Sequence, residues 1–132
     1  MTRNECDMKK LLSILPYKTI ATKSGLGWIG RSALFVTPEY GSAVALGAIL
    51  TDMPLEFGKA ITDSECDDCT NCQEACPVGA INPQKWNDRL SRDDIIDIEK
   101  CSKYIMNQFK AGSGCTKCMS ECKLTKEYLK KE

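Results

Sequence analysis

The chain between positions 66 and 77 reads Cys66-Asp67-Asp68-Cys69-Thr70-Asn71-Cys72-Gln73-Glu74-Ala75-Cys76-Pro77. Its four cysteines follow the spacing C-x2-C-x2-C-x3-C-P. Three thiolates at successive two-residue intervals on one tight loop can surround a single cube of iron and sulfide. The fourth thiolate is carried past them by a helical turn, which the proline ends, and it points toward a neighbouring cube. The stretch therefore predicts three ligands of one [4Fe–4S] cluster and one ligand of another.

A second copy of this run follows in the C-terminal part of the chain. One constant shift superimposes two sets of residues, namely Cys69, Thr70, Cys72 and Cys76 on Cys115, Thr116, Cys118 and Cys122. The shift places Cys66 on Gly112, so the fourth member has no counterpart, but Cys101 is available to fill the gap. Short internal repeats of this kind are typical of two copies of one binding unit.

We therefore predict two clusters that exchange ligands crosswise, as the runs of two-cluster bacterial ferredoxins do. The predicted ligands of the first cluster are Cys66, Cys69, Cys72 and Cys122. The predicted ligands of the second cluster are Cys101, Cys115, Cys118 and Cys76. Cys6 fits neither pattern and is predicted to be an unligated thiol. Since metal binding supplies folding free energy to such domains, we expect residues 63–122 to be largely disordered without iron.

Zinc is the main alternative occupant of these cysteines. The C-x2-C pairs of zinc sites usually lie much farther apart than three cysteines at successive two-residue spacing. The chain contains no histidine, which excludes Cys2His2 zinc sites, Rieske clusters and every catalytic pair that needs an imidazole. Nine cysteines are an odd number, which argues against a disulfide framework. A zinc-stabilised interaction module is the least favoured interpretation.

Length and charge bound the chain further. Its 132 residues suffice for one domain, or for one domain with an appendage. Because 18 Lys and Arg balance 18 Asp and Glu, no overall field indicates nucleic acid or membrane as a partner. No apolar run approaches the ~18 residues of a spanning helix, and Met1–Lys10 is too polar for a signal peptide. We therefore expect a cytoplasmic protein.

Composition divides the chain into two parts. The stretch from Leu11 to Leu55 is apolar, rich in glycine and free of cysteine, whereas cysteines, acids and lysines dominate from Asp63 onward. We predict an α+β fold with a partial glycine-rich α/β segment at residues 1–62. A ferredoxin-like domain for two [4Fe–4S] clusters is predicted to follow at residues 63–132.

A few elements can be predicted within these parts. Short strands are expected at Ala33–Val36 and Ala43–Thr51, joined by the turn Thr37–Gly41. The stretch Ser91–Phe109 is expected to be one long helix with its first residue as N-cap. The tail Lys123–Glu132 is expected to be a short charged helix or a frayed end.

The stretch Gly25-Leu26-Gly27-Trp28-Ile29-Gly30 matches the G-x-G-x-x-G pattern of dinucleotide sites, and Asp52 lies at about the distance of a ribose-binding acid. The context argues against such a site, because a helix must start inside the loop and Pro38 interrupts the chain soon afterwards. The glycines still indicate a backbone that is tight or closely approached. Trp28 could cover a flat cofactor or belong to the core. The basic stretch that includes Arg31 could meet an anionic cofactor or partner, or form only a basic face.

Several stretches in a fixed order resemble one enzyme family. They are LPYKTIATKS (Leu15–Ser24), the glycine loop, TPEYGS (Thr37–Ser42), LTDMPL (Leu50–Leu55), the cysteine run and the displaced Cys101. With these motifs the chain resembles the epoxyqueuosine reductases, and it is similar in outline to reductive dehalogenases. The resemblance implies two [4Fe–4S] clusters that deliver electrons to a cobalamin held near the glycine loop. It also implies a set of cofactor-binding residues, namely Gly25, Leu26, Gly27, Trp28 and Gly30.

The chain also departs from this family's pattern. Members carry a long N-terminal part that builds most of the cobalamin pocket, and some carry a C-terminal helical-repeat extension, neither of which matches here. They also have an acidic residue in a V-D-x-x-P-like stretch, where this chain has Leu11–Pro16 without an acid. Residues 1–62 thus resemble only the end of a cobalamin-binding catalytic domain, and we expect a fragment or a shortened relative.

Two functions remain open from the sequence. The first is an electron-transfer protein with two [4Fe–4S] clusters that serves a redox partner protein or a missing catalytic domain. The second is a cobalamin-dependent oxidoreductase that uses the Gly25–Gly30 loop at the corrin. No residue qualifies as a catalytic acid, base or nucleophile. The apolar residues Leu34, Phe35, Val44 and Leu46 are expected to be exposed and to pair with a partner or a second copy.

Overall fold

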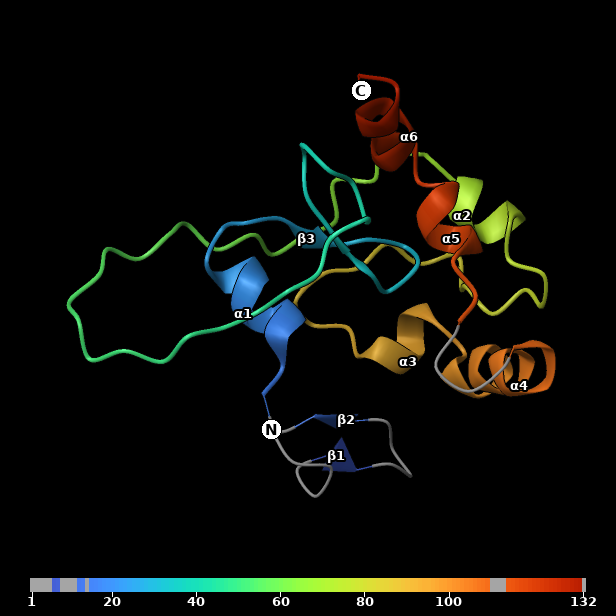
Figure 1. Ribbon diagram of the computed structural model, residues 1–132, viewed down its shortest axis with the longest axis horizontal. Coiled ribbons are helices and arrows are strands. Elements are labelled where there is room, and N and C mark those ends of the chain that lie inside the picture. Colours follow the sequence, from blue (N-terminus) through green and yellow to red (C-terminus); the bar gives the residue numbers. More distant parts are fainter. Residues whose placement is uncertain (1–5, 8–11, 14, 110–113, 132) are drawn as a thin grey trace.

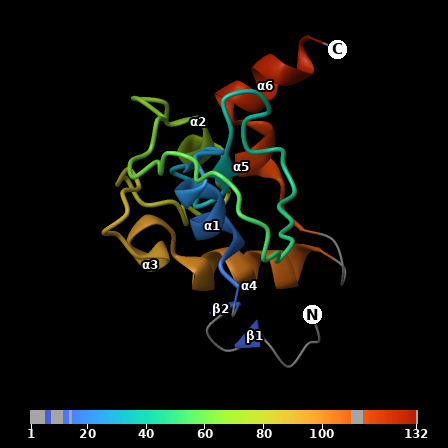
Figure 2. The same cartoon turned by 90° about the vertical axis from the view of Figure 1, so that its left-hand side faces the viewer.

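The computed structural model describes residues 6–7, 12–13, 15–109 and 114–131. Its elements, in chain order, are β1 (Cys6–Asp7), β2 (Leu12–Ser13), α1 (Tyr17–Lys23), β3 (Trp28–Ile29), β4 (Phe35–Val36), α2 (Asn71–Glu74), α3 (Arg92–Ile95), α4 (Ile98–Gln108), α5 (Lys117–Ser120) and α6 (Lys123–Leu129). β1 pairs with β2 and β3 pairs with β4, both antiparallel. In Figures 1 and 2, α3 and α4 lie at one end, α6 lies at the other, and α2 packs beside α5 between them. Short helices and small sheets agree with the predicted α+β class.

The hairpin formed by β3 and β4 carries the glycine loop into the core. The register pairs Trp28 with Val36 and Ile29 with Phe35. Of the strand predicted at Ala33–Val36, only the last two residues are strand, because Ala33 turns the chain in the left-handed region at φ 57°. The predicted turn that comes next is confirmed, since Thr37 and Gly41 bond each other's backbone at 2.9 and 3.0 Å.

The strand predicted at Ala43–Thr51 is wrong. This stretch has neither helix nor strand, and it leads into a wide loop beside α1 (Figure 1). A strand needs a neighbour for its backbone groups, and no strand lies alongside this stretch within the described parts of the chain. Val44 and Leu46 are half-buried here, and the end of the stretch is exposed, with Ile49 93% and Leu50 88% accessible.

The long helix predicted at Ser91–Phe109 is broken in the structure into α3 and α4. Ser91 is the N-cap of α3, as predicted, and the Asp94 carboxylate accepts from its N–H at 2.8 Å and from its hydroxyl at 2.7 Å. Ile96 then becomes extended and forms a β-bridge with Ile81. Asp97 restarts the helix as the N-cap of α4. Because the helix is interrupted at Ile96, the junction between α3 and α4, the backbone of Ile96 is free to pair with that of Ile81.

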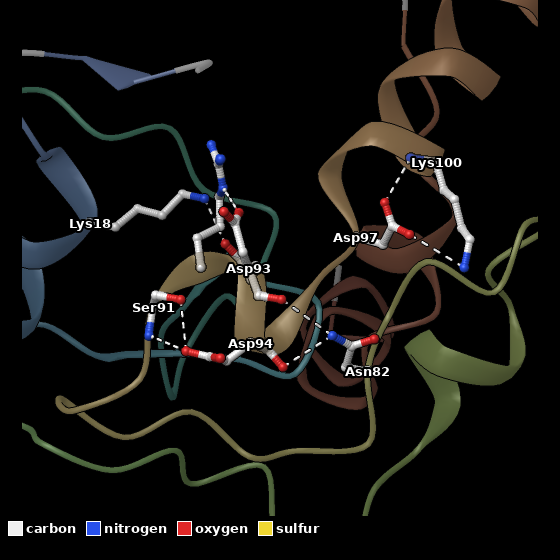
Figure 3. A network of polar contacts seen from close by, with 9 residues as sticks. Lys18, Asn82, Ser91, Asp93, Asp94, Asp97 and Lys100 are labelled. Carbon is white, nitrogen blue, oxygen red and sulfur yellow. Dashed lines mark hydrogen bonds and ion pairs between the residues drawn. The ribbon is translucent and has the colours of Figure 1, made fainter. Parts of the chain in front are cut away.

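Side-chain and backbone bonds fix this junction against the segment after the first cysteine run (Figure 3). The Asn82 amide donates to the carbonyls of Asp93 and Asp94 at 3.4 and 3.1 Å. The Asp97 N–H donates to the Ala80 carbonyl at 2.7 Å, and the Asp97 carboxylate accepts from the Lys100 N–H at 3.0 Å. These bonds hold the first turn of α4 close to the residues after the first cysteine run.

One hydrophobic core joins residues from both sides of position 62. Its buried members are Trp28, Ala33, Val36, Ala80, Ile81, Trp86, Ile95 and Ile96, and several cysteines pack partly buried against them. Phe35 is only 4% exposed, and Leu34, Val44 and Leu46 are half-buried, so the predicted exposure of these four residues is wrong. The later loop does expose large apolar side chains, among them Met53, Leu55 and Phe57. No described helix is long and apolar enough to cross a membrane.

The C-terminal helix α6 lies against the turn after β4. The Thr125 hydroxyl, 2% exposed, accepts from the Ser42 N–H at 3.0 Å, and the rings of Tyr40 and Tyr128 meet edge to face at 5.1 Å. Gly41 allows this approach, because a Cβ there would lie 2.2 Å from the Thr125 nitrogen. The tail is thus the predicted short helix, and it brings the last cysteine beside the hairpin.

Candidate metal centre

The two cysteine runs fold as a structural repeat. α2 and α5 each have four residues, and each begins after a threonine of nearly the same conformation, Thr70 at φ −114° and ψ 2° and Thr116 at φ −111° and ψ 7°. The last cysteine of each run closes the same turn, since the Cys76 N–H donates to the Gln73 carbonyl and the Cys122 N–H to the Met119 carbonyl, both at 3.2 Å. The repeat seen in the sequence is therefore also present in the backbone.

The two runs differ in the residue after their last cysteine. Pro77 comes after Cys76, and no helix begins there. Lys123 comes after Cys122, which is itself the N-cap of α6. A lysine has the backbone N–H and freedom of φ that proline lacks, so it is compatible with a helix starting at this point. Lys123, which stands where the first run has a proline, is thus the first residue of the helix that packs against the turn after β4.

Five cysteines from both runs line one cavity of about 450 Å³. Four of them, Cys66, Cys69, Cys72 and Cys122, are those that the sequence assigned to one cluster and are called the first cysteine group, and the fifth is Cys118. Burial, followed by the neighbouring thiols of Cys66, Cys118, Cys69 and Cys122, raises the pKa of the Cys72 thiol to about 11. A thiolate disfavours the ionisation of another thiol only when the two lie close together. A bound cation would offset this electrostatic cost of ionising the thiols.

The remaining four cysteines outside the N-terminal stretch form the second cysteine group, Cys76, Cys101, Cys115 and Cys118. Burial raises the pKa of the Cys101 thiol, and the Cys76 and Cys115 thiols raise it further. Burial likewise raises the pKa of the Cys118 thiol, with Cys115, Cys101 and Cys76 adding to the effect. Cys118 also lines the first cavity, so it lies between the two groups. These proximities are compatible with crosswise ligation, in which each run's last cysteine joins the other run's group, and that ligation stays a prediction.

The donor sets fit clusters better than single ions. Within the described ranges, no three His, Cys, Asp or Glu side chains converge as closely as the ligands of one metal ion. Four thiolates around one zinc would lie about 3.8 Å apart, from a Zn–S length of about 2.3 Å. Thiolates on the four separate irons of a cube lie farther apart, which suits a group of cysteines around a cavity. Cluster binding by the eight cysteines stays a prediction.

Hydrogen bonds single out Cys122 within the first group. Burial alone would raise the pKa of its thiol, but bonds from the Thr125 backbone, the Ser42 side chain and the Thr125 side chain together lower that pKa below its ordinary value. In the second group the Ala80 N–H donates to the Cys76 sulfur at 3.3 Å. Donors of this kind stabilise a negatively charged sulfur and tune a metal bound to it.

The glycine loop lies against the first cysteine group. A Cβ on Gly30 would be 3.4 Å from the Cys66 sulfur and 2.8 Å from a Val36 methyl group. Gly25 and Gly27 face backbone carbonyls in the same close way. Trp28 is 3% exposed and belongs to the core. The backbone approach that the three glycines indicated is therefore present, and contact of the loop with a corrin stays a prediction.

Leu26, at 60% exposure, is the large side chain of this loop that faces solvent. Buried residues near the cysteines that the sequence analysis did not assign to a cluster or cofactor site include Arg31, Ser42 and Thr125. Arg31 carried a weak sequence signal for anion binding. It directly follows the glycine loop and belongs to a basic stretch without carboxylates. Ser42 and Thr125 carried none, since their contact joins segments that are far apart in the sequence.

Comparisons with known proteins agree on one family. The epoxyqueuosine reductase of Listeria monocytogenes is 34% identical over 110 residues, which cover 78% of this chain and 28% of that protein. The epoxyqueuosine reductase of Gloeobacter violaceus is 40% identical over 87 residues, covering 66% of this chain and 24% of that protein. No family model matches the chain.

Solved structures give the same result. A crystal structure of epoxyqueuosine reductase with a tRNA-Tyr epoxyqueuosine-modified tRNA stem loop superimposes with a TM-score of 0.64 and 27% identity. The match covers 85% of this chain and 30% of that chain. The chain thus spans between 23% and 35% of the length of the relatives that it matches. The resemblance drawn from the sequence motifs is confirmed, and the chain is a homologue of the epoxyqueuosine reductases over that part of their length.

Proposed function

We propose that this chain is an electron-transfer module that carries two [4Fe–4S] clusters, similar to the corresponding part of epoxyqueuosine reductases. The observation that carries the proposal is that five cysteines from both runs line one cavity, while the Cys76 and Cys115 thiols lie close enough to Cys101 and Cys118 to raise the pKa of both. Exchange of the last cysteine of each run between two ferredoxin-like clusters would account for this arrangement. The 450 Å³ cavity between the thiols of the first group provides the room.

The chain's own residues would have distinct tasks in such a module. The first cysteine group would hold one cluster and the second group the other, and a bound [4Fe–4S] cluster supplies one-electron redox chemistry. The donors on Thr125 and Ser42 would stabilise the charge on Cys122, and the Ala80 N–H would do the same for Cys76. The core under the hairpin would exclude water from one side of the first group.

A redox partner protein or a catalytic domain outside residues 1–132 would receive the electrons. The exposed loop after β4 supports this part of the proposal. Ile49, Leu50, Met53, Leu55 and Phe57 are all at least 60% exposed, and Phe57 is fully so. A run of exposed large apolar side chains in one segment is typical of a surface that another polypeptide covers.

An anaerobic iron and sulfide analysis tests the proposal. We expect about eight irons and about eight sulfides per chain, and an EPR signal of two magnetically coupled centres after reduction with dithionite. About four irons would remove the second cluster from the proposal. Zinc without acid-labile sulfide, in protein that is folded, would replace it with the zinc-stabilised module.

A cobalamin-dependent oxidoreductase is the second candidate. The observation that favours it is the close approach of the glycine loop to the first group. A Cβ added to Gly30 would lie 3.4 Å from the Cys66 sulfur. Titration of the iron-loaded protein with hydroxocobalamin would then change the corrin absorbance at micromolar concentration. Leu26→Glu on the loop is expected to abolish that change, whereas Leu129→Glu, a similarly exposed leucine on α6, is expected to leave it intact. An unchanged corrin spectrum with the wild-type chain would exclude this candidate for the chain on its own.

A further inference from the structure

A buried arginine lies directly after the glycine loop. Arg31 is only 8% exposed. Its Nη1 donates to the Pro83 carbonyl at 2.7 Å and its Nη2 to the Asp67 carbonyl at 3.1 Å, while its buried Nε has no partner among the described residues. The side chain thus ties the hairpin to the first cysteine loop and to the segment beyond α2.

The charge of this guanidinium is not balanced by a carboxylate. Among the residues that the structure describes, no Asp or Glu forms an ion pair with Arg31. The two carbonyls accept hydrogen bonds but carry no net charge. Burying a charge without a counter-ion is costly, so buried charges in proteins are nearly always paired. The site therefore calls for an anion close to Arg31.

The candidate anion is the content of the first cavity. Arg31 lines that cavity together with Cys66, Cys69, Cys72 and Cys122. The residue before it, Gly30, approaches the Cys66 sulfur, and the carbonyl that it bonds belongs to Asp67, directly after Cys66. Thiolates that bind a [4Fe–4S] core give the whole assembly a net negative charge of roughly −2 when oxidised.

We propose that Arg31 is the buried counter-charge of the first cysteine group and raises the reduction potential of the centre bound there. This inference rests on the proposed function. One-electron reduction adds a negative charge at the site, and a neighbouring buried cation stabilises the reduced state more than the oxidised state. An electron shared between the two centres would accordingly be held preferentially on the first.

Nearby acids act in the opposite sense but more weakly. Glu65, Asp67 and Asp68 also line the cavity, and all three are exposed residues. Exposed charges act through an effective dielectric constant approaching about 80, whereas about 20 is appropriate for a buried charge. The single buried cation is therefore expected to outweigh each exposed anion.

The inference is tested by redox titration of anaerobically isolated protein, followed by EPR. Arg31→Met removes the charge, and Arg31→Lys keeps it but loses the fork of donors. Lys85→Met is the matched control, because Lys85 also carries a positive charge at this loop, 3.5 Å from the Asp68 carboxylate, but its side chain is 43% exposed. The signal of the first centre is identified as the one that Cys66→Ser abolishes.

For Arg31→Met we expect the ratio of reduced to oxidised first centre, at a fixed applied potential, to fall by at least about tenfold. For a one-electron couple this corresponds to a shift of about 59 mV. Arg31→Lys and Lys85→Met should change the ratio by less than about threefold, and the second centre should titrate as in the wild type. An unmoved first centre in iron-replete Arg31→Met would overturn the inference, as would an equal shift in Lys85→Met.

Loss of iron from Arg31→Met would leave the decision to Arg31→Lys. The counter-charge role requires Arg31→Lys to keep its iron and a potential near that of the wild type. Iron loss in Arg31→Lys as well would assign Arg31 to packing and overturn the inference. Wild-type protein without iron and sulfide would instead refute the proposed function itself, so the two failures can be told apart.

Discussion

The two cysteine groups share a backbone repeat but differ in their surroundings. The first group is built on one continuous loop plus Cys122, and a buried arginine, a glycine and the Ser42–Thr125 contact surround it. The second group gathers Cys76, Cys115 and Cys118 with Cys101, which comes from α4. Its position depends on the bonds that hold the α3–α4 junction to the segment after the first run.

This difference separates two requirements of a metal centre. Ligand spacing along the chain can be the same in both runs, since it depends on local turn geometry. The surroundings of the bound metal depend on which distant segments pack nearby, and they tune its charge and potential. Two centres of similar ligation can therefore have different properties within one small fold.

The largest effects are expected from cysteines close in sequence but assigned to different groups. Cys122→Ser should remove about four irons and the first centre's EPR signal, whereas Cys118→Ser should remove about four irons and the second centre's signal. The reason is the crosswise assignment, in which Cys122 completes the first group, whereas Cys118 belongs with Cys115, Cys101 and Cys76 although it also neighbours Cys72. Iron analysis with EPR of both variants is the measurement. Cys6→Ser, outside both groups, is the control and should keep about eight irons.

If Cys122→Ser and Cys118→Ser removed the same signal, the crosswise assignment would be refuted. A simple assignment of each run to its own centre predicts that outcome.

Crowding at the glycine loop is expected to affect the first group more than the second. Gly30→Ala places a methyl group 2.8 Å from a Val36 methyl and 3.4 Å from the Cys66 sulfur. Overpacking of this kind costs about 1–3 kcal/mol of unfolding free energy. Chemical denaturation should show that loss, together with weakened iron retention at the first centre. Gly47→Ala, where an added Cβ meets nothing within 4 Å, should match the wild type.

Equal loss of iron from both centres in Gly30→Ala would mean that the loop supports the fold as a whole rather than the first group.

Removal of a single hydroxyl near Cys122 should have a smaller effect. Thr125→Val deletes the acceptor of the Ser42 N–H, which is buried, and a donor to the Cys122 sulfur. An unpaired buried N–H costs about 1–3 kcal/mol, and loss of a donor to a ligand sulfur lowers the potential of the bound metal. Denaturation and redox titration check the two effects. Thr70→Val is the matched control, since its hydroxyl bonds only the exposed Glu74 carboxylate at 2.5 Å.

An unchanged potential in Thr125→Val, with a loss of stability, would reduce the Ser42–Thr125 contact to a packing role.

The sequence was sufficient to predict the parts of the site that depend on local rules. The repeat of the two cysteine runs and the Ser91 cap derive from short-range spacing and capping chemistry, which operate within a few residues, and the structure shows both. The division of the eight cysteines into two ligand sets joins distant segments and stays a prediction. α1, which begins directly after Pro16, was not predicted. The break at Ile96 was not predictable either, because its pairing with Ile81 is a tertiary contact that overrides the helical pattern.

The mistaken strand at Ala43–Thr51 illustrates the same limit. Its β-branched and apolar residues fit a pleated surface, yet strand formation needs a neighbouring strand, which the described part of the chain does not provide. Arg31 shows the limit for chemistry. Nothing in the spacing of the cysteines indicates which cation will be buried beside them, because that depends on the packing of the hairpin against the first loop.

The smallest effect is expected at the N-cap of α4, and it should concern the second group. The Lys100 N–H, followed by its side chain, holds the pKa of Asp97 below its ordinary value of 3.8 despite a small opposing effect of burial. A carboxylate with a lowered folded pKa stabilises the fold above its unfolded pKa, and this contribution is lost as the pH falls through the folded value. Asp97→Ala should therefore lower the thermal unfolding temperature slightly, by the same amount from about pH 8 to about pH 5.

Asp97→Asn keeps a capping oxygen and should recover most of the loss. Circular dichroism at both pH values, with iron analysis of the second centre, is the measurement. Because α4 positions Cys101, any iron lost from Asp97→Ala should come from the second centre. A difference from the wild type that disappears between about pH 8 and about pH 5 would show that Asp97 takes up its proton above its ordinary pKa in the folded protein, which would contradict a cap that lowers this pKa. Iron lost from the first centre would instead mean that a change beside the second group also disturbs the first. Every comparison between the two groups assumes that each depends on its own surroundings, and that assumption would then fail.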